Sequence, residues 1–282
     1  MIGRTISPSE ATDFQFCQKF WYNRRHLCMI PQKIGYKELA AMMGQTVGWM
    51  YDLHIRQEPF DGIEYFTATL EAQLACGRQY DYNGVEEYVP KVKQLILNHF
   101  KSLCESEPRW LGDGKIIASE PVMAMWGNSR QDLVIELPSG KGMVVDIKCK
   151  LKADSPKFAT SRDIDLNGNQ AQMYPLAWNS LNLPLKIKVM RFVYLQDDRE
   201  PIIEDVIVNI KRTERWLQAY HNVVGQINIL EAHPESMANR ITENPYHITP
   251  WGYPCEYLNY CMQGENPQGA LGEFIQIQRV RT

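Results

Sequence analysis

The sequence lacks the features that mark several familiar classes of protein. No apolar run reaches the roughly 18 residues of a transmembrane helix, and no signal peptide precedes Ser7, so we expect a cytoplasmic protein with no membrane partner. Internal repeats, coiled-coil heptads, glycine-rich phosphate-binding loops and Ser/His/Asp triads are also absent. Nothing in the chain therefore indicates a helicase motor.

Positive charge is not in excess. The chain has 30 Lys and Arg residues against 33 Asp and Glu residues, and its net charge of −3 gives no overall basic field of the kind that binds nucleic acid. Basic residues do cluster locally, between Lys19 and His26 and between Lys148 and Arg162. Such clusters are often only solvated surface, so charge alone does not decide the partner.

Cysteine is sparse, with seven residues in 282. In an intracellular chain these are more typical of reduced thiols or metal ligands than of disulfides. The composition, 44% hydrophobic and 22% charged, is that of an ordinary globular protein. The length fits one large domain or a core with an added helical lobe.

A β-hairpin is the most informative local pattern in the chain. Two apolar-rich runs, Asp132–Leu137 and Met143–Cys149, flank the turn-forming segment Pro138–Gly142. Val and Ile favour extended backbone, and Pro, Ser and Gly favour turns, so this pattern predicts two antiparallel strands.

The hairpin brings charged side chains together. Side chains alternate between faces along a strand, so Asp146 and Lys148 point the same way. If the connection is Leu137–Lys141, with an odd number of residues, Asp132 lies directly opposite Asp146 and shares its face. Two opposed carboxylates repel, and a hard divalent cation would remove that conflict. The alternative is an edge position where these charges are simply solvated.

The same residues resemble a known signature. Asp132, thirteen intervening residues and Asp146-Ile147-Lys148 resemble the D…(D/E)xK pattern of the PD-(D/E)XK nuclease superfamily. Gly127 ahead of Asp132 is similar to the "G…D" strand of that superfamily.

Three further segments extend the resemblance along the chain. Gln170 and Tyr174 resemble the QxxxY helix of RecB-like members. Ser7–Arg25 is similar to their "SPS…CPrkfyy" opening, and Tyr253–Cys261 resembles the cysteine tail of members that carry an iron–sulfur cluster. Such members include CRISPR-associated RecB-like exonucleases and many phage nucleases.

The resemblance implies an α/β (α+β) fold, a restriction-endonuclease-like αβββαβ core with a mixed sheet flanked by helices. We expect an N-terminal helical lobe in residues 1–110, the nuclease core in 111–235 and a cysteine-containing tail in 236–282. The apolar patterns predict one helix from Ser7 through Trp21, and further helices at Lys37–Ile55, Phe60–Ala75, Val85–Ser106, Asn169–Leu181 and Lys211–Ala232. Besides the hairpin, they predict strands at Ile116–Glu120, Lys186–Gln196 and Ile203–Ile210.

The resemblance also assigns roles to residues. Asp132, Asp146 and the Ile147 backbone carbonyl would bind Mg²⁺ or Mn²⁺, and Glu120 would support the ion directly or through water. Lys148 would position the attacking water. Gln170 would orient that water or bind a phosphate, and Tyr174 would pack against the DNA backbone or the lysine. Glu120 could instead be a surface charge at a strand end.

One expected ligand is missing. RecB-like nucleases usually carry a metal-binding histidine in a G-x-x-x-H pattern, but Gly44 is followed by Gly48 at that position. His54 lies six residues further on, in the wrong register to replace it. Many members of the superfamily lack this histidine, so catalysis remains compatible with the sequence.

The cysteine pattern is also incomplete. Cys17, Cys255 and Cys261 are candidate ligands of a 4Fe–4S cluster, with His247 or Cys28 as a fourth. The family places another tail cysteine where this chain has Gly252. Zinc, or no metal, is the alternative, and the role of a cluster would be structural.

The resemblance therefore implies a metal-dependent DNA exonuclease that acts on linear DNA with ends, in recombination, repair or phage DNA processing. A helicase, recombinase or single-strand-binding protein is a candidate partner, and a phage-encoded protein would act in the host cytoplasm. The polar segment Asp154–Gly168 is a candidate DNA contact. Two alternatives are a DNA-binding or assembly module without catalysis and a structure-specific endonuclease.

Overall fold

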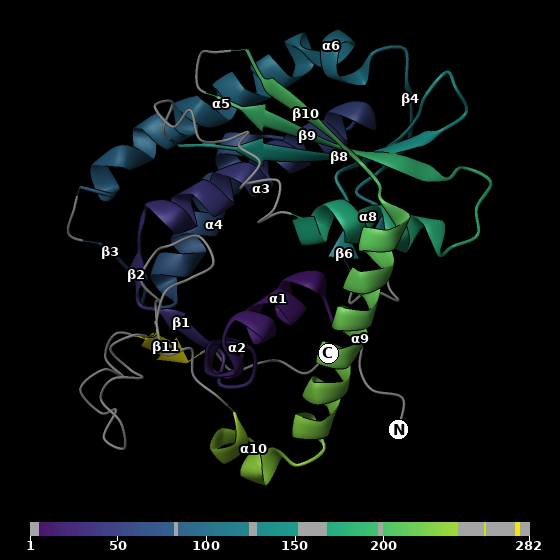
Figure 1. The fold of residues 1–282 in the computed structure, drawn as a ribbon. Coiled ribbons are helices and arrows are strands. Elements are labelled where there is room, and N and C mark those ends of the chain that lie inside the picture. The colour runs from purple at the N-terminus through teal and green to yellow at the C-terminus, as the bar shows by residue number, and fades with distance from the viewer. Residues whose placement is uncertain are drawn as a thin grey trace.

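The structure is a computed structural model, and it describes residues 6–81, 84–123, 129–151, 168–196, 200–241, 257 and 274–276. A five-stranded mixed sheet forms its centre, with the strand order β10-β9-β8-β7-β4 (Figure 1). These strands are β4 (Lys115–Ser119), β7 (Leu133–Glu136), β8 (Gly142–Cys149), β9 (Ile187–Leu195) and β10 (Ile202–Ile207).

The order of the core elements along the chain matches the prediction. Neighbouring strands are antiparallel except for β8 and β9, which are parallel. A parallel pair needs a crossover, and helix α8 (Gly168–Asn179) lies between these two strands in the chain. Three strands, a helix, two strands and helix α9 (Ile210–Glu231) follow one another as predicted, so the mixed α/β fold is confirmed.

Helices cover both faces of the sheet because its side chains alternate between two hydrophobic clusters (Figure 1). Val134 and Val144 belong to the cluster on the side of α8, α9 and α1 (Pro8–Phe16). Val145 and Ile135 belong to the cluster on the side of α3 (Tyr36–Ile55), α4 (Gly62–Ala75) and α5 (Val89–Glu105).

Helices from residues 1–110 thus lie on both faces of the sheet. The division of the chain into three regions stays a prediction. Among the described residues, no helix combines the length and apolar character needed to cross a membrane.

The N-terminal helix is broken, which corrects the prediction of one continuous helix. α1 ends at Phe16 and α2 (Gln18–Arg25) begins after Cys17, whose backbone is extended with φ −159° and ψ 115°. The Phe20 amide donates to the Cys17 sulfur at 3.4 Å, so this cysteine caps the second helix. The helical spacing of the apolar residues continues through the break, which is why the pattern did not reveal it.

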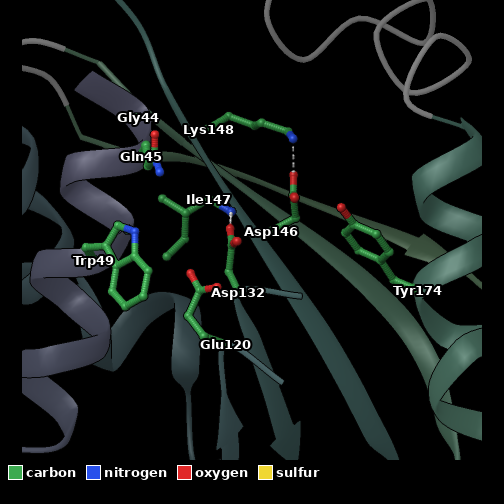
Figure 2. Close-up of a pocket in the computed structure, with 10 residues that line it drawn as sticks. Gly44, Gln45, Trp49, Glu120, Asp132, Asp146, Ile147, Lys148 and Tyr174 are labelled. Carbon is green, nitrogen blue, oxygen red and sulfur yellow. Dashed lines mark hydrogen bonds and ion pairs between the residues drawn. The ribbon is translucent and has the colours of Figure 1, made fainter. Parts of the chain in front are cut away.

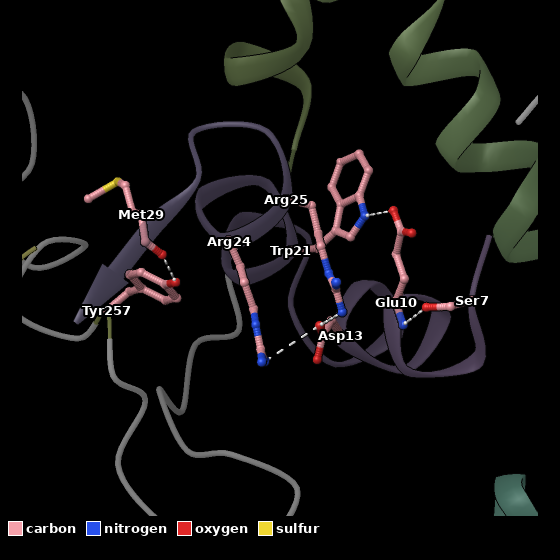
Figure 3. Close-up of polar contacts among 8 residues, drawn as sticks. All are labelled: Ser7, Glu10, Asp13, Trp21, Arg24, Arg25, Met29 and Tyr257. Carbon is pink, nitrogen blue, oxygen red and sulfur yellow. Dashed lines mark hydrogen bonds and ion pairs between the residues drawn. The ribbon is translucent and has the colours of Figure 1, made fainter. Parts of the chain in front are cut away.

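Polar contacts hold the two short helices together (Figure 3). Ser7 caps α1 by accepting a hydrogen bond from the Glu10 amide at 3.2 Å. The Glu10 carboxylate accepts a hydrogen bond from the Trp21 indole at 3.0 Å, and Arg25 donates to Asp13 at 3.1 Å. These bonds join α2 to α1 across the break.

Several short elements escaped the sequence patterns. They are α6 (Glu107–Leu111), α10 (Pro234–Arg240), the 3-10 turn Glu86–Tyr88 and three two-stranded pairs: β1 (Met29–Pro31) with β11 (Phe274–Gln276), β2 (Lys33–Ile34) with β3 (Gln79–Tyr80), and β5 (Val122–Met123) with β6 (Ser129–Arg130). Two or three residues are too few to show a period, so such pairs depend on tertiary contacts.

Candidate active site

The register of the β7–β8 hairpin sets the positions of its carboxylates. Leu133 pairs with Val145, and the Leu137 amide donates to the Lys141 carbonyl at 2.9 Å, so the connection has the expected odd length. One step beyond the Leu133 pair, Asp132 lies opposite Asp146. Its Oδ2 accepts a hydrogen bond from the Ile147 amide at 2.5 Å.

Lys148 lies on the same face of β8 as Asp146. The Lys148 ammonium is 2.6 Å from Asp146 Oδ2, and the lysine side chain is 30% exposed while that of the aspartate is only 5% exposed. The lysine therefore links a buried carboxylate to the open side of the site (Figure 2).

Burial and the neighbouring charges shift the pKa values of Asp132 and Lys148. The pKa of Asp132 is raised to about 8, first by burial and then by the negative charges of Asp146 and Glu120. The hydrogen bond from the Ile147 amide and the charge of Lys148 lower this pKa, but by less. Burial opposes the charged form of Lys148, but Asp146 and Asp132 outweigh it and raise the pKa of this lysine above its ordinary value. Near neutral pH the metal-free site thus favours a protonated Asp132 and a charged lysine.

A pocket of about 270 Å³ opens at this end of the sheet, between α3 and α8 (Figure 2). The strands and the segment after β4 contribute its charged and peptide groups, and the two helices contribute the walls. The residues that line it are Gly44, Gln45, Gly48, Trp49, Glu120, Asp132, Asp146, Ile147, Lys148 and Tyr174.

Glu120 reaches the pocket through an unusual backbone conformation. It follows the last residue of β4 with φ +48°, in the left-handed region that side chains other than glycine rarely adopt. Its amide donates to the Asp132 carbonyl at 2.9 Å, and its side chain lines the pocket. The structure therefore places Glu120 beside the two aspartates.

Helix α8 brings Tyr174 to the opposite side of the pocket from α3 (Figure 2). The buried Gln131 side chain donates to the Tyr174 carbonyl at 2.8 Å and ties the helix to the residue before Asp132. The backbone of Gln170 belongs to α8, but its side chain lies outside the described part of the chain, as do Gly127 and the predicted contact segment up to residue 167.

Helix α3 supplies pocket residues that the sequence patterns did not single out. Gln45 and Trp49 line the pocket beside Gly44 and Gly48. The available signal was the spacing of four residues between Gln45 and Trp49, because residues four apart lie on the same face of a helix. His54, in contrast, packs its ring between Tyr51 and Phe100 and does not line this pocket.

The donor groups of the pocket suit a hard cation. Carboxylate oxygens and the Ile147 carbonyl are the ligand types of Mg²⁺, and a cation would favour ionised Asp132 despite its neighbour. In the described residues, no group of three or more His, Cys, Asp or Glu side chains is placed to hold a metal ion. An ion here would therefore depend on two aspartates, a backbone carbonyl and water.

Only part of the predicted cysteine site can be described. Cys17 is buried in a small cluster with Phe20, Met29 and Tyr257. The Tyr257 hydroxyl donates to the Met29 carbonyl at 2.7 Å (Figure 3). Because Tyr257 belongs to the same cluster as Cys17, one point of the tail packs close to this cysteine. Three of the other candidate ligands, Cys255, Cys261 and His247, lie outside the described residues.

The chain is similar to proteins of known structure and to one protein family. A candidate exonuclease of known structure from Eubacterium rectale is 13% identical over 85% of this chain and 84% of its own, with a TM-score of 0.47. The protein SSO0001 is 11% identical over 69% of this chain and 76% of its own, with a TM-score of 0.28. A search of curated proteins finds no match. The sequence model of the PD-(D/E)XK nuclease superfamily matches residues 5–262, well over half of the chain. The chain therefore belongs to the PD-(D/E)XK nuclease superfamily.

Proposed function

We propose that this protein is a metal-dependent DNA exonuclease of the RecB-like branch. The observation that carries the proposal is the opposition of Asp132 and Asp146 in the lining of a pocket, with Lys148 paired to Asp146 at 2.6 Å. Membership of a nuclease superfamily supplies the reaction class, the hydrolysis of a phosphodiester bond.

Asp132, Asp146 and the Ile147 carbonyl would hold Mg²⁺ or Mn²⁺, and Glu120 would support the ion directly or through water. When bound, the ion would supply Lewis-acid polarisation of the scissile phosphate and make a nearby water more acidic. The Ile147 amide fixes one oxygen of Asp132 at 2.5 Å, which leaves the other oxygen to face the pocket.

Lys148 carries the remaining role. Its charged ammonium, held by Asp146, can orient a water by donating a hydrogen bond to a lone pair of that water. The same positive charge can stabilise negative charge on the phosphate as the bond breaks. Gln170 would orient the same water, and Tyr174 would pack against the DNA strand that enters the pocket between α3 and α8.

The preference for ends, the setting in recombination, repair or phage DNA processing, and the cytoplasmic location are supported by the sequence resemblance. The same holds for a helicase, recombinase or single-strand-binding partner. Circular single-stranded DNA tests the preference for ends, because an exonuclease leaves it intact whereas a structure-specific endonuclease opens it.

We also propose a 4Fe–4S cluster that joins the tail to the N-terminal helices through Cys17, Cys255 and Cys261, with His247 as the fourth ligand. The burial of Cys17 next to Tyr257 supports it. Oxygen-free purification of the wild type should yield iron and sulfide, and Cys255→Ser should lose both. The exposed Cys76→Ser variant is the control. Zinc, or no metal, in the wild type would overturn the cluster.

Cleavage of end-labelled linear DNA tests the nuclease proposal. We expect degradation in Mg²⁺ or Mn²⁺ but not in EDTA, and a loss of about 10²- to 10⁴-fold in Lys148→Ala, the range of a positioned acid–base or charge-stabilising group. Lys141→Ala removes an exposed lysine from the turn of the same hairpin and should leave the rate unchanged. Binding of DNA and metal without cleavage of any substrate would instead favour a non-catalytic DNA-binding module.

A further inference from the structure

The α3 wall of the pocket has no part in the hydrolysis described above. It consists of Gly44, Gln45, Gly48 and Trp49, which form one edge of the helix. Trp49 is half-buried and Gln45 is exposed. Figure 2 shows Trp49 on the side of the pocket opposite Tyr174, with Asp132 and Asp146 between the two rings.

Packing does not require the two glycines. A Cβ atom at Gly44 would lie 3.9 Å from the Cys149 Cβ, and one at Gly48 would lie 3.8 Å from Glu120 Oε1, which are ordinary contacts. Glycine is a poor residue for a helix interior, so two of them here weaken α3 without serving its packing. At these two positions α3 therefore presents no side chain to the pocket.

The charge of the pocket limits how it can bind a nucleotide. Asp132, Asp146 and Glu120 stand against one lysine, Lys148, so the lining carries an excess of negative charge when its acids are ionised. A divalent cation would offset that excess but leave no surplus positive charge for phosphates. Affinity within the pocket must then come from uncharged contacts, and an aromatic face contributes strongly because any base can stack on it.

We propose that Trp49 and Gln45 form a subsite for the unpaired base of the nucleotide next to the scissile phosphate. The indole would stack on the base, and the Gln45 amide would hydrogen-bond its edge. A base inside a duplex is covered by its neighbours and cannot reach a side chain in this pocket. The substrate strand is therefore single-stranded, or unpaired at its end, where it enters the site. This inference rests on the proposed nuclease function for the identity of the adjacent phosphate.

An abasic scan of the wild-type protein tests the subsite without any substitution. Fluorescent single-stranded oligonucleotides, each lacking one base at a different position, are bound in Ca²⁺ and cleaved in Mg²⁺. A missing base should lower the affinity about tenfold at one position and little elsewhere. An equal loss at every position, or no loss at any, would overturn the subsite.

Variants then assign that effect to the indole. Trp49→Leu should bind the intact strand about tenfold more weakly and lose the position effect of the abasic scan, whereas Trp49→Phe should keep most of both. Trp216→Leu, which removes a partly buried tryptophan of α9, is the matched control. If Trp49→Leu weakens intact and abasic strands equally, Trp49 has only a structural role.

The two proposals can fail separately. A wild type that shows the position effect in binding but cleaves no substrate would keep the subsite and overturn the nuclease proposal. Metal-dependent cleavage with a flat abasic scan would do the reverse. If Trp49→Leu fails to fold by thermal denaturation, the wild-type scan alone decides the subsite.

Discussion

Asp132 is the residue whose charge state is most constrained by its surroundings. Its pKa of about 8 in the metal-free protein lies far above the value of about 3.9 in an unfolded chain. Between these two pH values the folded state holds a proton that the unfolded state releases. The folded state is therefore favoured at the acid end, and this stabilisation is lost as the pH rises through about 8.

We expect Asp132→Asn to remove that dependence, because an amide cannot ionise. In EDTA, the melting temperature of the variant should fall less than that of the wild type between about pH 5 and about pH 8, and the variant should be the more stable of the two at the higher pH. Thermal denaturation across this range measures both. Parallel pH profiles for the two proteins would contradict the assignment, and comparing them cancels the titration of groups that lie away from Asp132.

Glu120 holds a strained backbone conformation at the edge of the pocket, with φ +48°. Glycine adopts that conformation without the clash of a Cβ atom, whereas alanine retains it at a cost of about 1 kcal/mol. We expect Glu120→Gly to be more stable than Glu120→Ala by about that amount. Both variants lack the carboxylate and should lose cleavage to a similar extent.

Urea unfolding of the two Glu120 variants gives the stability difference, and the labelled-DNA assay gives the activity. Equal stability would mean that the left-handed conformation relaxes when the side chain is removed. Full activity in both variants would remove Glu120 from the site.

At the scale of elements, α3 trades stability for an open pocket. Gly48→Ala should raise the free energy of unfolding by about 1 kcal/mol, because alanine is the better helix residue and its methyl group fits. The same methyl group would lie 3.8 Å from Glu120 Oε1, at the α3 wall of the pocket. Because it would take up space beside this carboxylate, we expect cleavage to fall about tenfold or more.

Gly225→Ala provides the matched control for this trade. Gly225 lies on the exposed side of α9, and apart from its chain neighbours and the backbone of its own helix, no atom of the described residues lies within 4 Å of the place that a methyl group would take. The substitution should therefore give a similar gain in stability and leave cleavage unchanged. Urea unfolding and the labelled-DNA assay again provide the two measurements. A Gly48→Ala variant that keeps wild-type activity would show that cleavage does not need the space left by glycine at this position.

The sequence predicted the elements that carry a strong local signal. The parity of the connection after Leu137 was enough to place Asp132 opposite Asp146, because strand geometry allows only two choices. The resemblance did not predict the wall formed by Gln45 and Trp49, because the family pattern concerns only the metal-binding histidine that Gly48 replaces. The hydrophobic periodicity of a helix predicts which face is buried, but it does not reveal a pocket that glycines border. The break at Cys17 was hidden for a similar reason, since both short helices share one apolar spacing.

At the scale of the whole molecule, distant parts of the chain meet around the N-terminal helices. The Tyr220 hydroxyl of α9 donates to the Ile6 carbonyl, and Tyr257 packs its ring 5.3 Å from that of Phe20. Strand β1 pairs with β11 close to the C-terminus (Figure 1). Because these contacts join segments more than 200 residues apart, local sequence patterns could not predict them.

Tyr257 offers the sharpest test of this closure. Its hydroxyl is buried and donates to the Met29 carbonyl at 2.7 Å, so Tyr257→Phe leaves a buried carbonyl without that donor. We expect a loss of about 1 to 3 kcal/mol in the free energy of unfolding, and about 3 to 5 kcal/mol for Tyr257→Ala, which also empties the space of a large ring.

The matched control is Tyr65→Phe, which removes the hydroxyl of a half-buried tyrosine on α4 and should change the stability by less than about 0.5 kcal/mol. Urea unfolding followed by circular dichroism measures all three variants. If Tyr257→Phe and Tyr257→Ala match the control, the tail does not stabilise the fold, and a metal cluster there would have no structural partner. If both lower the stability in the expected order, docking of the tail is part of the folding unit, because a segment that only rested on the surface could not transmit its loss to global unfolding.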